Sequence, residues 1–558
     1  MLQSKPFKER TMSKILTFFF CCSLFILMSC GKSTIDQGLK EITEEHLRHH
    51  IAVLSDDSLG GRGPSTKGDF LATSYIASEF KTMGLEPAGE KNSFFQQVPM
   101  IGISVKPFSL DFRKAGKSVS LKFIDDFVAF SGVQDRSVLL KDIEVVFVGY
   151  GIEAPEQNWD DYKGYDVKGK ILLMLNDDPP SDDPTFFGGK GRTYYGRWTY
   201  KFEIAARKGA IGAIILHTTP SAGYPFQVWQ GSWSREQFDL EGNASAPLKL
   251  KGATSEDATR RYITLAGLDL SKLQKDATQK TFKPVPLGIK LNANMNVSAR
   301  RLETKNVVGI LRGSHPELSK QYVVFSAHHD HLGMGRPVDG DSIYNGALDN
   351  ASGISMMLNM AKAFSSMNPK PSRSLVFAAV AAEEYGLLGS QYYAGHPTVP
   401  LKDIAANINT DGLNIWGKTS DITFLGWERS SLKEDIEAVA GEMGMTISED
   451  GYPEKGFFYR SDHFNFAKVG VPSLSYEAGN HFIGKPADYS KQVRAKYEEQ
   501  NYHQPSDELS KDWIFDGGMK DCEFIVRLAS RIANNAALPT WRQGDEFEAV
   551  RLKTLGKM

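Results

Sequence analysis

Four short apolar runs after residue 300 constrain the fold of this chain most strongly. They are Tyr322 to Ala327, Ser374 to Ala381, Ile404 to Asn409 and Val471 to Tyr476, and the clearest helix-like segment between them runs from Ala351 to about Phe364. Strands that alternate with helices are typical of a parallel α/β sheet. We therefore predict a mixed, largely parallel sheet flanked by helices for this part of the chain.

Side chains of the kinds that bind metal ions follow these strands. Ligands of open α/β sheets bind at the carboxyl ends of the strands, so residues at those positions are candidates for a functional site. The candidates at the strand ends and in nearby loops are His328, Asp330, Asp349, Glu383, Glu384, Asp411 and His503.

This combination of residue types suits hydrolysis by a pair of metal ions. Two imidazoles and three carboxylates fit two zinc-like ions, and one carboxylate can bridge them. Such ions lower the pKa of a bound water and stabilise an oxyanion, while a further carboxylate moves the proton to the leaving amine. The adjacent Glu383 and Glu384 fit this division of tasks, because successive residues at a strand end point in different directions.

Six local motifs carry a more specific signal than any single acidic or histidine pair, which is more often a surface feature. They are Ala-His-His-Asp-His, Gly-Ala-Leu-Asp-Asn-Ala-Ser-Gly, Glu-Glu-Tyr-Gly-Leu-Leu-Gly-Ser, Asn-Thr-Asp-Gly, Arg-Ser-Asp-His-Phe-Asn-Phe and Tyr-His-Gln-Pro-Ser-Asp. Together these motifs, at about residues 300–535, resemble the di-zinc exopeptidase family that contains bacterial leucyl-type aminopeptidases, glutamate carboxypeptidase II and glutaminyl cyclases.

The resemblance implies two Zn²⁺ ions per chain and assigns their ligands. His328 and Asp411 would bind one ion, Glu384 and His503 would bind the other, and Asp349 would bridge both. Each of these residues stands at the position that matches the family motif.

The resemblance also implies three residues that act beside the metal ions. Glu383 matches the general acid/base, and Asp330 matches the carboxylate that orients a ligand imidazole. Tyr502 matches a tyrosine that stabilises the oxyanion in some members, although a packing role is an equal alternative. Three histidines lie in the same stretches without matching family ligands: His329, His331 and His463.

Changes in sequence pattern along the chain, read together with the resemblance, predict five segments. They are a signal peptide (1–29), the N-terminal part of the peptidase domain (30–138), an inserted β-rich unit that resembles a protease-associated domain (139–292), the catalytic metallopeptidase domain (293–540) and a C-terminal tail (541–558).

The N-terminus has the pattern of a targeting segment. A basic stretch precedes an apolar run from Ile15 to Met28, which is too short to span a bilayer comfortably but suits a signal peptide; Met12 is an alternative start. The sequence Leu27-Met28-Ser29-Cys30-Gly31 resembles the lipobox of bacterial lipoproteins. We therefore expect a lipid anchor on Cys30 and a place in the bacterial cell envelope, at the outer membrane, with the periplasmic and surface sides both open.

The remaining cysteine and the overall charge limit the chemistry. Of the 4 cysteines, only Cys522 would stay unmodified in the mature chain, where a buried core position is expected. The 558 residues carry 65 Lys and Arg against 67 Asp and Glu, so no basic excess points to a nucleic-acid partner. The expected partners are a peptide substrate and the membrane lipid; the oligomeric state is open.

The sequence thus predicts a metallo-exopeptidase, with aminopeptidase activity expected first. Carboxypeptidase or dipeptidase activity uses the same metal core, and glutaminyl cyclases reuse these ligands around one zinc ion. A non-enzymatic alternative is an inactive peptidase fold that serves as a binding module. That alternative predicts lost ligands, and all five are present.

Overall fold

The computed structural model describes Met1 and residues 34–557, except positions 134, 184 and 243–246. Cys30 and the expected signal segment after Met1 therefore lie outside the described residues. Within the described part of the chain, no helix is both long enough and apolar enough to cross a membrane.

The main sheet is built on four parallel strands in the order β17–β14–β18–β21, which are β17 (Ser374–Val380), β14 (Tyr322–His328), β18 (Ile404–Thr410) and β21 (Ser473–Ala478). On one side the sheet continues through β19 (Asp421–Leu425) and β20 (Thr446–Ser448). On the other side it continues through antiparallel partners: β13 (Val285–Leu311), β1 (Glu86–Pro87), β2 (Phe95–Val105) and β11 (Gln237–Leu240).

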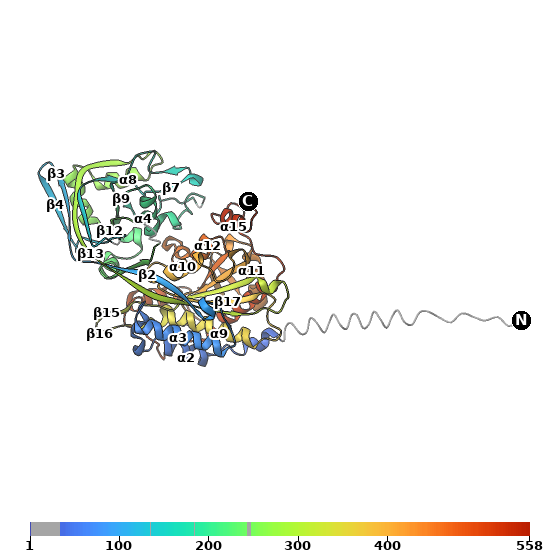
Figure 1. Ribbon diagram of the computed structural model, residues 1–558. Coiled ribbons are helices and arrows are strands. Elements are labelled where there is room, and N and C mark those ends of the chain that lie inside the picture. The colour runs from blue at the N-terminus through green and yellow to red at the C-terminus, as the bar shows by residue number, and fades with distance from the viewer. Residues whose placement is uncertain (2–33, 134, 184, 243–246, 558) are drawn as a thin grey trace.

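Helices cover both faces of this sheet (Figure 1). Alternate residues of β14 enter different cores, with Val323 and Phe325 in one and Val324 in the other, as the alternation of side chains along a strand requires. The larger core contains α2 (Glu44–Leu54), α3 (Lys67–Thr82), α9 (Gly353–Ser366), α11 (Leu432–Met443) and α14 (Asp516–Asn534). The smaller core contains α10 (Leu388–Gly395) and α12 (His463–Lys468). The remaining helices of this part are α13 (Tyr489–Gln500), whose Tyr497 packs against the larger core, and α15 (Glu548–Thr554).

A second sheet has its own hydrophobic core, which includes Phe112, Ile214 and Tyr262. Its strands are β3 (Ser109–Lys114), β4 (Lys117–Lys122), β5 (Phe127–Phe130), β6 (Ser137–Phe147), β9 (Ile171–Leu175), β10 (Gly212–His217), β12 (Leu250–Ser255) and the first part of β13. The helices of this unit are α4 (Trp198–Arg207), α5 (Thr219–Ala222), α6 (Phe226–Trp233), α7 (Glu256–Ala266) and α8 (Leu270–Ala277). Two short hairpins complete the strands: β7 (Glu153–Ala154) with β8 (Trp159–Asp160), and β15 (Gly333–Val338) with β16 (Asp341–Tyr344).

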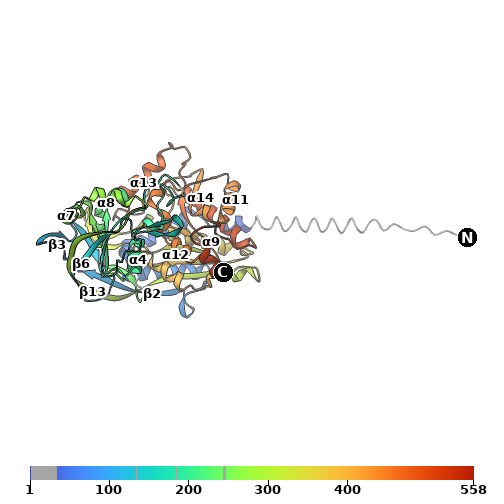
Figure 2. The same cartoon turned by 90° about the horizontal axis from the view of Figure 1, so that it is seen from above.

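Strand β13 connects the two sheets without a break. Its first part, from Val285 to Asn296, pairs with β6 and β3 in the second sheet. Its next part, from Val297 to Val307, pairs antiparallel with β2, and its end pairs with β17 in the main sheet. The long curved strand is visible between the two units in Figure 1, and Figure 2 shows it from above.

The predicted fold class is confirmed, because the four apolar runs form parallel strands and the predicted helix is α9. The second sheet begins at β3, before the expected boundary at residue 139. The assignment of this unit to protease-associated domains stays a prediction. Cys522 is fully buried in the main core, as expected.

Candidate metal centre

All the candidate metal ligands meet at one edge of the main sheet. Strands β17, β14 and β18 are parallel neighbours, so their carboxyl ends share that edge. The turn before α9 and the loop after α13 reach the same edge from outside the sheet. The residues that converge there are His328, Asp330, Asp349, Glu383, Glu384, Asp411 and His503.

Asp349 lies between two imidazoles. The Nε2 atom of His328 is 3.3 Å from Asp349 Oδ1 and 3.1 Å from Asp411 Oδ1. On the other side, His503 Nε2 is 3.3 Å from Asp349 Oδ2 and 3.1 Å from Glu384 Oε2. Each imidazole therefore faces two carboxylates, and Asp349 presents one oxygen to each imidazole.

These distances fit a coordination shell better than a set of hydrogen bonds. Ligand atoms at 2.0–2.1 Å around a tetrahedral zinc ion are separated by about 3.3 Å. One N–H group cannot donate well to two carboxylates in different directions. His503 Nε2 is also buried and has no hydrogen-bond partner among the described residues. The donor set thus fits a zinc-like cation.

His331 has a different task from the ligands beside it. Its Nδ1 atom lies 2.6 Å from Glu384 Oε1, which is a hydrogen-bond distance and is too short for two ligands of one tetrahedral ion. Although its ring nitrogen is close enough to Asp349 and Glu384 for a metal group, we assign His331 to orienting Glu384. Its neighbour His329 instead contacts Asp69 Oδ1 at 3.0 Å. The sequence has three histidines within four positions, which indicated a candidate metal site. It did not indicate that the three side chains point in different directions.

Asp330 supports the site through the backbone. Its carboxylate accepts the backbone N–H of Glu383 at 3.1 Å and lies 3.5 Å from that of Glu384. The carboxylate is 3.7 Å from His328 Nδ1, whereas the Asp330 carbonyl oxygen is 3.2 Å from that atom. The carbonyl group, more than the expected carboxylate, therefore orients the His328 ring.

Several supporting residues were not singled out from the sequence. Ser461 Oγ donates to Asp411 Oδ2 at 2.7 Å. Asp507 accepts the backbone N–H groups of Leu348 and Asp349 at 3.0 and 3.1 Å, and thereby holds the turn before α9. Both residues lie inside the quoted motifs, so the motifs were the available signal.

Gly346 explains why this turn can approach so closely. Its φ is 57°, and an added Cβ would lie 2.2 Å from Asp349 O and 2.5 Å from His331 Cγ. A side chain has no room there and would also strain the backbone. The first glycine of the Gly-Ala-Leu-Asp motif therefore permits the contact between two ligand-bearing loops.

The site carries an excess of negative potential. Although burial opposes the charged imidazolium, neighbouring carboxylates raise the pKa of His503 to about 10 and that of His328 well above its ordinary value. Burial would raise the pKa of Glu384, yet His503 and His331 hold it at about 2. Burial, opposed by His328 but reinforced by neighbouring carboxylates, raises the pKa of Glu383 well above its ordinary value. A divalent cation would neutralise this potential.

Tyr502 packs against the candidate ligand that follows it. Its ring stacks on His503 with 3.9 Å between the ring centroids. This contact fits a packing role, which is one of the two roles that the sequence left open for Tyr502. The other role, stabilising the oxyanion, stays a prediction.

Comparison with known proteins agrees with this site. Residues 306–528 match the sequence model of Peptidase family M28. The chain is 27% identical over 293 residues to a glutamate carboxypeptidase 2 homolog of Caenorhabditis elegans, covering 44% of this chain and 34% of that protein. It is 27% identical over 225 residues to aminopeptidase YwaD of Bacillus subtilis (strain 168), covering 38% and 43%. The matches thus span less than half the length of these relatives.

A solved structure extends the likeness in fold over nearly the whole chain. The aminopeptidase from Aneurinibacillus sp. strain AM-1 has a TM-score of 0.53 at 18% identity, covering 90% of this chain and 97% of that one. This solved structure shows a shared fold, and the sequence match to Peptidase family M28 is confined to residues 306–528. The matched segment contains every candidate ligand.

Proposed function

We propose that this chain is a zinc-dependent aminopeptidase that hydrolyses N-terminal residues from peptides. The observation that carries the proposal is the shared position of Asp349, whose two oxygens each lie 3.3 Å from a different imidazole. This geometry suits two Zn²⁺ ions, one held by His328 and Asp411 and one by Glu384 and His503, with Asp349 common to both.

Glu383, Asp330 and the metal ligands would have separate roles in hydrolysis. When bound, the two ions would supply a water of lowered pKa and positive charge for the developing oxyanion. Glu383 follows the same strand as Glu384 but makes no contact with the imidazoles at ligand distance, so it is free to take the proton from the water and return it to the leaving nitrogen. Asp330 fixes the backbone of Glu383 for this task.

A substrate screen tests whether the protein removes residues from the N-terminus or from the C-terminus of a peptide. We expect the zinc-loaded protein to cleave aminoacyl-anilides with a free amino group and to leave N-blocked dipeptides intact. Cleavage of only the N-blocked substrates would favour carboxypeptidase activity. Cyclisation of N-terminal glutamine without hydrolysis would favour glutaminyl cyclase activity, and inactivity on every substrate would favour a binding module.

We also propose that Cys30 carries a lipid anchor that holds the protein in the bacterial envelope, at the outer membrane. The support is the lipobox-like sequence that ends at Gly31. Metabolic labelling with a radioactive fatty acid should mark the full-length protein but not a Cys30→Ser variant. Equal labelling of both proteins would contradict the assignment.

A further inference from the structure

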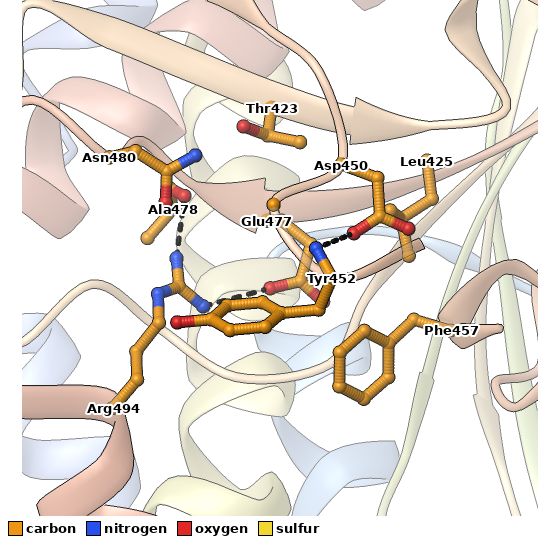
Figure 3. A pocket seen from close by; sticks show the side chains of 10 residues that line it. Thr423, Leu425, Asp450, Tyr452, Phe457, Glu477, Ala478, Asn480 and Arg494 are labelled. Atoms are coloured by element: carbon orange, nitrogen blue, oxygen red, sulfur yellow. Dashed lines mark hydrogen bonds and ion pairs between the residues drawn. The ribbon is translucent and has the colours of Figure 1, made fainter. Parts of the chain in front are cut away.

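A small pocket with a cavity volume of about 20 Å³, partly open to solvent, lies at the end of strand β21 (Figure 3). This space holds about one water-sized group, so it suits the end group of a side chain whose stem lies in the open mouth of the pocket. Its lining combines two carboxylates, one guanidinium and two aromatic rings: Glu477, Asp450, Arg494, Tyr452 and Phe457.

The pocket adjoins the metal centre through the strand register. Thr410 of β18 pairs with Tyr476 of β21, and the two strands are parallel. Asp411, a candidate metal ligand, and Glu477, which lines the pocket, are the residues that directly follow this pair. A substrate whose scissile bond lies at the metal ions would have its first side chain within reach of this pocket.

Glu477 can accept hydrogen bonds in addition to the one that Arg494 donates. The guanidinium donates to the Ala478 carbonyl oxygen at 2.7 Å and to Ser490 Oγ at 3.3 Å. It reaches Glu477 Oε2 only at 3.4 Å, which is the one hydrogen bond that this carboxylate accepts within the described chain. The Glu477 side chain is 30% exposed, so its carboxylate can accept a further hydrogen bond from a ligand.

Asp450 adds a second negative charge. Its Oδ1 atom accepts the backbone N–H of Tyr452 at 2.8 Å, and no ion pair within the described residues neutralises it. Burial raises the pKa of Glu477 to about 7 and also raises that of Asp450. With one arginine against two carboxylates, the pocket has an unmatched negative charge when both carboxyl groups are ionised, and a bound cation would favour their ionised forms.

The walls suit an aliphatic stem. The Tyr452 and Phe457 rings line the pocket, and such apolar faces pack well against the methylene groups of long basic side chains. Two other cations contact these rings, Lys455 and Arg460, but neither lines the pocket. Lys455 is already paired with Glu498 at 2.6 Å.

We propose that this pocket receives the side chain of the substrate's first residue and selects a cationic one, lysine or arginine, whose end group donates to Glu477. The inference rests on the proposed aminopeptidase function and names its substrate class. Norleucine is the matched neutral probe, because its side chain has four carbons like that of lysine but lacks the ammonium group.

The test compares kcat/KM for the 4-nitroanilides of lysine, arginine and norleucine with zinc-loaded wild-type protein. We expect lysine and arginine to exceed norleucine by on the order of 10-fold or more, the factor that a hydrogen bond to a charged group supplies. Norleucine equal to or better than lysine would overturn the inference while leaving the aminopeptidase proposal intact. Failure to cleave any of the anilides would instead overturn the proposed function.

Two variants test whether Glu477 is responsible for the preference for lysine over norleucine. Glu477→Gln should lower the lysine-to-norleucine ratio of kcat/KM about 10-fold, since the variant side chain carries no charge to pair with the ammonium group. Glu454→Gln is the matched control, because Glu454 is exposed nearby and does not line the pocket; its ratio should stay at the wild-type value. An unchanged ratio in Glu477→Gln would overturn the assignment. If that variant does not fold, the wild-type ratio still decides the selectivity.

Discussion

At the residue scale, the histidines that follow β14 show how the loop geometry divides similar side chains. His328 faces two carboxylates, His329 contacts Asp69 and His331 contacts Glu384. His328 was singled out as a candidate ligand through the family motifs. The directions of the His329 and His331 side chains depend on contacts with α3 and with the turn after β17. Both elements are distant in sequence, so the local pattern could not predict these directions.

Replacing Glu383 separates metal binding from proton transfer. Glu383→Gln keeps the shape of the side chain but cannot accept a proton, so turnover should fall by at least about 100-fold. The zinc content should remain near two ions per chain, because Glu383 is outside the pairs of ligand atoms at 3.1–3.3 Å.

Elemental analysis and initial rates check this expectation together. Asp411→Asn provides the contrasting variant, since it should lose zinc as well as activity. Activity retained in Glu383→Gln would contradict the general-base assignment, and zinc lost from it would show that Glu383 is a ligand.

At the scale of secondary-structure elements, the parallel strands were predictable because each is a short, continuous apolar run that is buried on both faces. Strand β13 was not predicted. Its alternating burial from Val285 to Val297 is a local strand signal, but the pairing with β2 joins residues about 190–210 positions apart. An alternation of buried and exposed residues indicates a strand, but it does not identify the strand that pairs with it or the sheet to which it belongs.

The glycine-rich turn η1 (Asp57–Arg62) holds the loops that carry the ligands. Buried Arg62 donates to the carbonyl oxygens of Leu54, His329, Asn345 and Gly346 at 2.5–2.9 Å. Arg62→Met leaves these acceptors without a donor, so the free energy of unfolding should fall by about 3 kcal/mol or more. Urea denaturation measures this change. The exposed Arg113→Met on β3 should change it by less than about 0.5 kcal/mol; equal effects would contradict the role of Arg62.

The contact between α14 and β21 should make stability depend on pH. Asp521 is buried and accepts the Tyr476 hydroxyl at 2.6 Å, and burial raises its pKa to about 7. The unfolded carboxyl ionises near pH 4, so the folded state holds the proton more tightly and this group destabilises the fold as pH rises from about 4 to 7.

Asn at position 521 does not titrate. The free energy of unfolding of Asp521→Asn, relative to wild type, should therefore increase by about 2–3 kcal/mol between pH 5 and pH 8. Urea denaturation at pH 5.0, 6.5 and 8.0 checks both the size and the direction. A difference that is constant with pH, or that falls as pH rises, would refute this account.

At the scale of the whole molecule, the candidate metal centre lies on the main sheet, while the second sheet has a separate core. Without cations, the carboxylates at the site repel each other, so a bound metal ion stabilises the folded state. Chelation with EDTA should lower the melting temperature by on the order of 5 °C or more, and added Zn²⁺ should restore it. The melting temperature of His328→Ala should respond far less to EDTA, and an equal response would place the stabilising metal elsewhere.

The continuous pairing of β2 with β13 also affects how the chain is made. One edge of β2 pairs with β11, but the other edge has no partner until residues 297–307 have been synthesised, about 190 residues after β2 itself. At about 5–20 residues per second, this edge waits for roughly 10–40 s. During that interval the nascent chain exposes an unpaired strand, which is the kind of surface that ribosome-associated chaperones and export factors protect from aggregation.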